Sequence, residues 1–249
     1  MVHNSKWFVP LPGKLPTRMR LFCFPFAGGG ASFYRLWRDK LPDDVEIVLV
    51  CLPGREQRFG EPVIDTIDAM VAHIHDAILP LTDLPYAFFG YSMGAIISHH
   101  LACEIVGNGG TGPNQLFLSA RRSPDLELTR APLNALPSET FWQQVAKYGG
   151  TPKEILENEE YRQLFEAPLR ADFKLSETAV SSHLPKLSCP ITVFGGDTDT
   201  SPVPEHLAGW ADATCGAFAK HIYPGGHFFI TDHVDAVTAI VSDRLGSVS

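Results

Sequence analysis

The sequence lacks three features that would place it in a membrane, secreted or zinc-binding class. Its longest apolar runs fall short of about 18 residues, so we expect no transmembrane helix. The stretch from Met1 to Pro16 has no apolar core of the kind found in signal peptides. The five cysteines are odd in number and scattered, without a Cys-x-x-Cys pair or a Cys/His spacing for zinc. We therefore expect a cytoplasmic protein with reduced cysteines and no metal site.

Charged residues are also scarce, at 19 % of the chain, whereas hydrophobic residues make up 45 %. The first figure is too low for a coiled coil or a disordered acidic chain, and the second supplies a full core. A formal net charge of −8 argues against nucleic acid as a partner, because binding to phosphates needs a basic face. The length of 249 residues suits one domain over residues 1–249, and nothing in the sequence indicates an obligate oligomer.

The charge is unevenly distributed, since the segment from Gly13 to Arg58 holds eight basic and five acidic residues. An acidic partner can dock on this segment if the basic side chains share a surface. Ordinary solvated charges are the alternative explanation, and the sequence alone favours that alternative.

Short apolar runs alternate with helical patterns along most of the chain. Continuous hydrophobic runs of this length are typical of strands that are buried on both faces of a parallel sheet. The predicted strands are Arg20–Phe24, Glu46–Cys51, Tyr86–Gly90, Gln115–Ser119, Ile191–Phe194 and Lys220–Tyr223. Helices are predicted after Ser32 and Asp65, each a candidate N-cap, and after Asp232. The alternation predicts an α/β fold with a mostly parallel sheet flanked by helices.

One stretch, approximately residues 121–187, breaks this alternation because it contains no good strand. Helical runs are predicted at Ser138–Tyr148, Pro152–Asn158 and Glu159–Phe173. Since the stretch is too long for a plain connection, we expect a helical insertion over the sheet. A lid above a binding site is the functional interpretation, and a purely structural excursion is the alternative.

The strongest local motif is Gly90-Tyr91-Ser92-Met93-Gly94, which directly follows a predicted strand. Before a helix, this pattern is typical of a nucleophile elbow, a sharp turn that needs small residues on either side of the serine. The helix that follows presents its positive end to the serine. We therefore predict that Ser92 is a nucleophile.

A serine hydroxyl needs a general base, and in enzymes with such an elbow an acid and then a histidine follow along the chain. His227 stands on the Gly-rich loop Pro224-Gly225-Gly226, after the last predicted strand. An ordinary pKa of about 6.5 suits an imidazole for proton transfer near neutrality. His227 is the predicted base, chosen over histidines inside predicted helices.

The acid should follow the strand that ends near Phe194, where the chain reads Gly195-Gly196-Asp197-Thr198-Asp199. A Gly-x-x-Asp spacing counted from Gly196 selects Asp199, and Asp197 stays the alternative. The acid would accept the second N–H of the imidazole and stabilise the imidazolium.

Catalysis by a serine also requires an oxyanion hole. One donor is normally the backbone N–H after the nucleophile, here Met93. The loop Phe24-Pro25-Phe26-Ala27-Gly28-Gly29-Gly30 follows an earlier strand and supplies Ala27 as the second donor. A phosphate loop is the rival interpretation of these glycines, but no Gly-Lys-Ser/Thr follows them.

Taken together, these blocks resemble the type II thioesterases that accompany nonribosomal peptide and polyketide synthases, a family of the α/β-hydrolases. The resemblance also rests on Leu52-Pro53-Gly54-Arg55-Glu56-Gln57-Arg58, and on Pro224-Gly225-Gly226-His227-Phe228-Phe229. The Pro-Gly-Arg-Glu-x-Arg core is the more specific block, because an elbow occurs in all α/β-hydrolases. The blocks span nearly the whole chain, and the insertion is matched weakly.

The resemblance implies an α/β-hydrolase fold and an enzyme that removes aberrant or stalled acyl groups from the phosphopantetheine arm of carrier proteins. It implies catalytic roles for Ser92, Asp199 and His227, and oxyanion contacts from Ala27 and Met93. The expected partner is an acyl or peptidyl carrier protein, and the expected enzyme is a monomer without a cofactor. The insertion would shape the acyl pocket, with these aromatic residues as candidate lining or core packing: Phe141, Trp142, Tyr148 and Phe165.

Arg55 and Arg58 have two interpretations. They can contact the pantetheine phosphate or an acidic carrier, or they can hold their loop by pairing with Glu56 or Glu61. For the whole protein, two other functions stay open at this point. One is a general esterase or acyl-CoA hydrolase of the same fold, and the other is a carrier-binding module without catalysis.

Overall fold

The core of the protein is a seven-stranded sheet with the strand order β1-β3-β2-β4-β5-β6-β7. The computed structural model describes residues 5–123, 125–126, 130–179, 181 and 184–247. All neighbouring strands pair in parallel except β1 and β3, which are antiparallel. The strands are β1 (Phe8–Leu11), β2 (Met19–Phe24), β3 (Val45–Val50), β4 (Tyr86–Tyr91), β5 (Gln115–Ser119), β6 (Ile191–Gly196) and β7 (Phe218–Tyr223).

The six predicted strands are confirmed, with shifts of one or two residues at half of their ends. The first strand, Phe8–Leu11, was not predicted, because it is only four residues long and contains Pro10. Proline cannot donate to a ladder, so it is tolerated at a sheet edge, and β1 is an edge strand.

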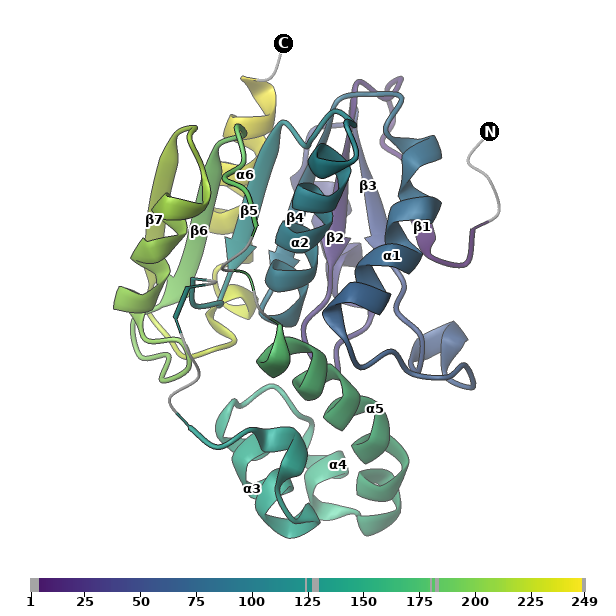
Figure 1. The fold of residues 1–249 in the computed structure, drawn as a ribbon, viewed down its shortest axis with the longest axis vertical. Helices are drawn as coiled ribbons and strands as arrows, with labels where there is room; N and C mark the ends of the chain where they lie inside the picture. Colours follow the sequence, from purple (N-terminus) through teal and green to yellow (C-terminus); the bar gives the residue numbers. More distant parts are fainter. Residues whose placement is uncertain (1–4, 124, 127–129, 180, 182–183, 248–249) are drawn as a thin grey trace.

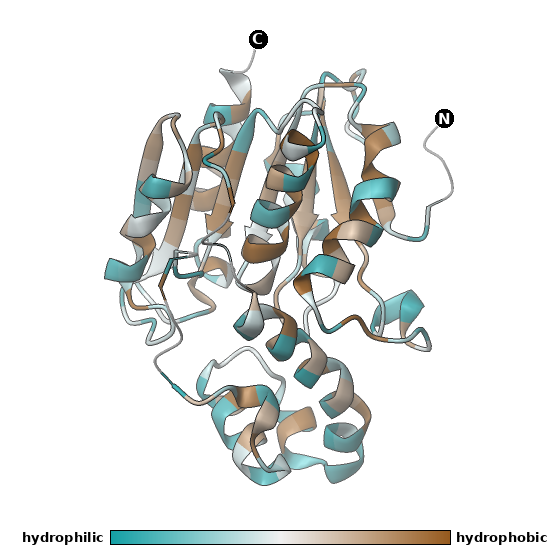
Figure 2. Ribbon diagram, in the orientation of Figure 1, coloured by the Kyte–Doolittle hydropathy of each residue, from teal (hydrophilic) through white to brown (hydrophobic). Residues whose placement is uncertain are grey.

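Two apolar layers cover the two faces of the sheet (Figure 1). One layer packs α1 (Ile67–Ile78), α2 (Met93–Gly107) and the 3₁₀ segment η5 (Pro204–Ala213) against side chains such as Phe22 and Phe88. The other packs η1 (Ala31–Lys40) and α6 (Val234–Gly246) against Leu21 and Phe89. Figure 2 shows the consequence, with apolar strands between helices that are polar on their outer sides. Shorter 3₁₀ segments are η2 (Glu56–Arg58), η3 (Leu79–Leu81), η4 (Leu133–Ala135) and η6 (Phe229–Thr231).

Two predicted helix caps are wrong. The helix near Ser32 begins at Ala31 behind Gly30, and the carboxylate of Glu56 accepts the N–H groups of Ala31 and Ser32 at 2.9 and 3.0 Å. The helix near Asp65 begins after Thr66, without a side-chain cap. The Asp65 carboxylate instead pairs with Lys174 at 2.5 Å. At η1 a tertiary contact replaces the local cap, and at α1 the tertiary ion pair engages the predicted capping side chain instead.

The predicted insertion is present between β5 and β6, although residues 124, 127–129, 180 and 182–183 within it lie outside the described residues. Its described part contains helices and no strand, and it lies beyond the carboxyl end of the sheet (Figure 1). The helices are α3 (Ser138–Lys147), α4 (Lys153–Glu157) and α5 (Glu159–Thr178). Helix α5 is five residues longer than predicted and contains Pro168 without ending there.

No helix in the described part of the chain is both long and apolar enough to cross a bilayer.

Candidate active site

Ser92 lies in the sharp turn between β4 and α2. Its backbone φ of +53° is in the left-handed region, where side chains other than glycine are rare. Ser92 N–H donates to the carbonyl of Ser119 on β5 at 2.8 Å, which ties the strained turn to the neighbouring strand. The hydroxyl is thereby held above the end of the strand at the start of α2, as the elbow motif predicts.

The two glycines of the motif are required by close packing around this turn. A Cβ at Gly90 would overlap the backbone of Gly94 and Ala95, and a Cβ at Gly94 would overlap the carbonyl of Phe24. The chain therefore needs glycine at both positions, because any side chain would push α2 away from the sheet.

A chain of hydrogen bonds joins Ser92, His227 and Asp199, which come from the ends of β4, β7 and β6. The Ser92 hydroxyl lies 3.0 Å from Nε2 of His227, and Nδ1 of His227 lies 2.8 Å from Oδ2 of Asp199. With the proton on Nδ1, Nε2 is free to accept the serine proton. His227 and Asp199 are both buried, so water competes little for these contacts.

Asp197 does not reach the imidazole. Its carboxylate accepts the N–H of Gly225 at 2.9 Å, and its side chain is exposed. Asp197 thus fixes the start of the loop that carries His227, whereas the second oxygen of Asp199 accepts the N–H of Ser201 at 2.9 Å.

Tyr91 stabilises the loop that carries His227. Its hydroxyl donates to the carbonyl of His227 at 2.6 Å, and its ring stacks on the imidazole at 6.1 Å between centroids. Burial, together with the nearby charge of Asp199, raises the pKa of the Tyr91 phenol far above its ordinary value, so it stays a donor. The motif analysis did not single out this residue, although it precedes the nucleophile.

The predicted oxyanion donors, Ala27 and Met93, come from the turn after β2 and from the start of α2. Met93 opens α2 directly after Ser92, with its side chain fully buried in the core. Ala27 is the second residue of a β-turn closed by a 2.9 Å bond from Gly29 N–H to the carbonyl of Phe26. Ala27 lines the same cavity as Ser92.

The cavity has a volume of about 760 Å³ and lies between the sheet and the insertion. Ser92, Asp199 and His227 line it from the sheet side. Trp142, Tyr148 and Phe165, three of the four candidate lining residues, line it from the insertion, although the sequence alone favours core packing for most of them. Phe141 does not: it is fully buried in the small apolar cluster of the insertion, with the guanidinium of Arg170 4.2 Å from its ring centre.

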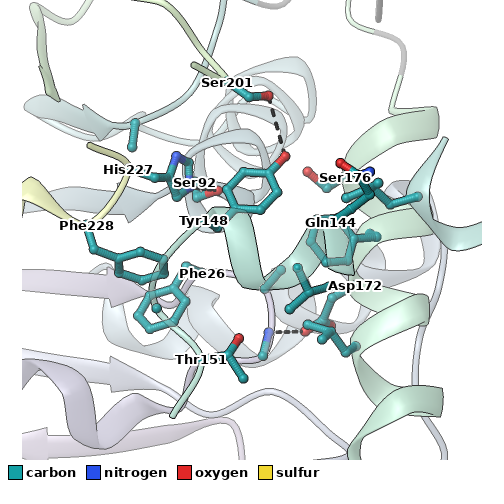
Figure 3. Close-up of a pocket in the computed structure, with 18 of the residues that line it drawn as sticks. Phe26, Ser92, Gln144, Tyr148, Thr151, Asp172, Ser176, Ser201, His227 and Phe228 are labelled. Atoms are coloured by element: carbon teal, nitrogen blue, oxygen red, sulfur yellow. Dashed lines mark hydrogen bonds between the residues drawn. The ribbon is translucent and has the colours of Figure 1, made fainter. Parts of the chain in front are cut away.

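Tyr148 lies close to Ser92 and His227 (Figure 3). Its ring meets the imidazole of His227 edge to face at 5.0 Å, and its hydroxyl contacts Ser201 at 3.4 Å. Arg130 donates to the same hydroxyl at 3.2 Å. The insertion thus touches both loops that carry the acid and the base.

Arg58 is buried, the side chain of Arg55 is 10 % exposed, and both are paired within the protein. Arg58 donates to Glu61 and to the carbonyl of Cys51, and the cavity lining in the described residues does not include it. Arg55 lines the cavity, but it forms a two-pronged ion pair with Asp172 of α5 at 2.7 and 2.8 Å. The contacts support the alternative in which this pair holds its loop, with Asp172 as the partner of Arg55 instead of Glu56.

The excess positive charge of the Gly13–Arg58 segment is largely compensated inside the protein. Arg38 donates to backbone carbonyls. The other paired cations meet carboxylates: Lys14–Asp43, Arg18–Asp44, Arg20–Glu46, Lys40–Asp235, Arg55–Asp172 and Arg58–Glu61.

Asp172 was missed by the sequence analysis. The signal was available, because Leu169, Asp172 and Leu175 recur at helical spacing and place the carboxylate on the buried face of α5. No group of three or more His, Cys, Asp or Glu side chains in the described ranges is arranged to hold a metal ion.

Comparisons with known proteins agree with this geometry. A thioesterase domain family model matches residues 19–245. The gramicidin S biosynthesis protein GrsT of Aneurinibacillus migulanus is 36 % identical over 226 residues, which cover 91 % of this chain and 88 % of GrsT. The thioesterase PikA5 of Streptomyces venezuelae is 32 % identical, covering 98 % of this chain and 87 % of PikA5.

Solved structures of type II thioesterases have the same fold. The type II thioesterase BorB from the borrelidin biosynthetic cluster superimposes with a TM-score of 0.88 at 30 % identity, covering 98 % of this chain and 99 % of BorB. ClbQ from the colibactin pathway gives 0.87 at 31 % identity, covering 93 % and 98 %. The mostly parallel sheet is therefore that of the α/β-hydrolases, and the chain belongs to the thioesterase domain family.

Proposed function

We propose that this thioesterase hydrolyses aberrant or stalled acyl groups from the phosphopantetheine arm of carrier proteins in nonribosomal peptide or polyketide synthesis. The observation that carries the proposal is the hydrogen-bonded chain Ser92–His227–Asp199 at the floor of a 760 Å³ cavity. Relatives that match nearly the whole chain include the type II thioesterase BorB, the thioesterase PikA5 and the gramicidin S biosynthesis protein GrsT. The partner is then an acyl or peptidyl carrier protein, and the enzyme acts as a cytoplasmic monomer.

In the first half of the proposed reaction, Ser92 Oγ attacks the thioester carbonyl while Nε2 of His227 takes its proton. The N–H groups of Ala27 and Met93 stabilise the oxyanion of the tetrahedral intermediate. Asp199 holds the imidazole in the correct tautomer and stabilises the imidazolium. The intermediate collapses to an acyl ester on Ser92, and the pantetheine thiol leaves with the proton from His227.

In the second half, water enters and His227 takes one of its protons. The resulting attack forms a second tetrahedral intermediate in the same hole. Its collapse releases the carboxylic acid and returns the proton to Ser92. The chain's own residues suffice for each proton transfer.

We assign residues 121–187 the role of a lid within one working unit formed by residues 1–249. Tyr148 and Trp142 line the cavity from this side, where an acyl chain would lie. Arg55, with its ion pair to Asp172, stays a candidate for the pantetheine contact only if that pair opens.

The testing experiment measures acyl release from an acetyl-phosphopantetheinyl carrier protein, with acetyl-coenzyme A run in parallel. Wild type is compared with Ser92→Ala, and Ser98→Ala serves as a matched control. Ser98 is a buried serine of the same helix whose hydroxyl bonds only within that helix, to Ala95. We expect rapid release from the carrier, slow release from coenzyme A, no release by Ser92→Ala and normal release by Ser98→Ala.

Equal rates on both substrates would instead indicate a general acyl hydrolase. A carrier that binds without being turned over, in a protein that no serine-directed phosphonate labels, would indicate a binding module.

A further inference from the structure

Asp172 is a buried carboxylate that the proposed reaction does not use. It lies on α5 with 1 % of its surface exposed, and Figure 3 shows it on the insertion side of the cavity. Its oxygens accept three hydrogen bonds: two from Arg55, at 2.7 and 2.8 Å, and one from the N–H of Gly28, at 2.7 Å. The last of these joins the insertion to the loop that carries Ala27.

The hydrogen bond from Gly28 to Asp172 holds the β-turn Phe26–Gly29, in which two backbone N–H groups are not used to close the turn. Gly28 is the third residue of the turn Phe26–Gly29 and has a φ of +75°, the value that a type II turn needs at that position. Such a turn uses the N–H of its fourth residue to close, and leaves those of the second and third for outside partners. Asp172 accepts the N–H of the third residue, Gly28. The N–H of the second residue, Ala27, therefore remains available to bind an oxyanion.

Arg55 also binds this turn, at the carbonyl of Gly29. All five N–H donors of a guanidinium can be counted here, because Arg55 donates to Asp172 twice, to Pro53 twice and to the carbonyl of Gly29 once. The pair Asp172–Arg55 therefore grips the turn at Gly28 N–H and at Gly29 C=O. Leu169, one helical turn before Asp172, fills the space that a Cβ at Gly28 would occupy.

We propose that Asp172 is a positioning residue for the oxyanion hole: through Gly28 it holds the Ala27 N–H where the oxyanion forms. The hole is then complete only while α5 is docked, so the insertion takes part in the rate as well as in substrate fit. This inference rests on the proposed serine mechanism and on Ala27 as a donor, and it does not depend on the identity of the acyl carrier.

The test compares Asp172→Asn with Lys174→Gln. Lys174 is the matched control, because it lies two residues away on α5 and breaks a different ion pair between the insertion and the rest of the protein. Asparagine keeps the volume of Asp172 but places an amide against the Arg55 fork. The substrate is acetyl-N-acetylcysteamine, a thioester without a carrier, and the probe is an alkyl trifluoromethyl ketone, which forms a tetrahedral adduct on Ser92.

We expect Asp172→Asn to lower kcat about tenfold or more, since loss of one oxyanion donor costs roughly 10²–10³. KM should change by less than about threefold, because the ground-state thioester gains little from the hole. The Ki of the ketone should rise by the same factor by which kcat/KM falls. Lys174→Gln should leave kcat and Ki unchanged.

The proposal is overturned if Asp172→Asn raises KM alone, leaves the ketone Ki unchanged, or behaves like Lys174→Gln. Should Asp172→Asn fail to fold, Arg55→Lys decides, since lysine keeps the charge and loses the fork. A parallel loss of kcat and ketone affinity in Arg55→Lys, smaller than that expected for Asp172→Asn, supports the positioning role of the Asp172–Arg55 pair. An unchanged Ki for the ketone refutes it. Wild type that hydrolyses the carrier-free thioester but releases nothing from carriers would refute the proposed function while leaving this inference intact.

Discussion

The sheet and the insertion are each stabilised by a different balance of apolar and polar contacts. The sheet lies between two large apolar clusters, and its central strands are buried along their whole length. The insertion has one small cluster, consisting of Leu133, Phe141, Trp142, Val145 and Leu169. It meets the rest of the protein through polar contacts such as Arg55–Asp172, Asp65–Lys174 and Gly28–Asp172, and through apolar contacts such as that of Leu175 with the sheet-side cluster.

This difference assigns separate tasks to the two regions. Ser92, His227 and Asp199 all leave the ends of sheet strands, so their geometry is set by the larger core. The insertion contributes the cavity wall and the grip on the turn at Gly28. Ion pairs and hydrogen bonds need good geometry and give way to water more readily than an apolar core does. The insertion is therefore the region able to adjust to different acyl groups.

The largest expected effect tests the sheet side. Asp199→Asn should lower kcat about 10⁴-fold, because the amide favours the wrong tautomer of His227 while keeping its position. Asp197→Asn is the matched control, two residues away, and should cost far less since Asp197 bonds only the loop backbone at Gly225. Steady-state kinetics on an acyl thioester make the measurement. Equal losses in the two variants would contradict the assignment of the acid.

The next effect compares the two cores directly. Phe88→Ala, in the cluster between the sheet and α1–α2, should lower the global free energy of unfolding by about 3–5 kcal/mol. Phe141→Ala should mainly loosen the insertion, because its cluster is small and separate. Urea unfolding reads the first effect and hydrogen exchange in α3 and α5 reads the second. A global loss from Phe141→Ala as large as that from Phe88→Ala would show that the two regions unfold together.

A third effect is the loss of folding stability at acid pH. Burial, with a smaller contribution from His100, lowers the pKa of His99 on α2 to about 3, so His99 is neutral in the folded state. The unfolded chain binds a proton below about pH 6.5 and the folded chain does not, so stability falls as pH drops from about 6.5 toward 3. At pH 5 the loss is about 2 kcal/mol. Urea unfolding of His99→Gln should show a flatter slope over this range, and an unchanged slope would place the acid sensitivity elsewhere.

The smallest effect concerns an exposed ion pair of the insertion. Lys174→Gln should change the free energy of unfolding by less than about 1 kcal/mol, because Lys174 and Asp65 are both half exposed. The difference from wild type should vanish in 1 M salt, which screens exposed charges. A larger loss that persists in salt would show that this pair anchors the insertion as firmly as an apolar contact.

The sequence predicted what local patterns encode. Apolar runs marked six strands, and spacing rules selected Ser92, His227 and Asp199, which the structure joins by hydrogen bonds. The caps at Ser32 and Asp65 were wrong, because residues far along the chain supply the contacts, as Glu56 does for η1. Helical spacing could have placed Asp172 on the buried face of α5, but its partners, Arg55 and Gly28, lie more than a hundred residues away and no local pattern identifies them.

The order in which the site residues are synthesised follows from the order of their strands along the chain. The turn Phe26–Gly29 follows β2, Ser92 follows β4, the proposed acid Asp199 follows β6 and the proposed base His227 follows β7, which is an edge of the sheet. A ribosome that has made the chain only as far as Phe218 has produced a serine without its base. Under the proposed mechanism, hydrolytic activity requires synthesis past His227, and products truncated before it carry a serine that cannot turn over.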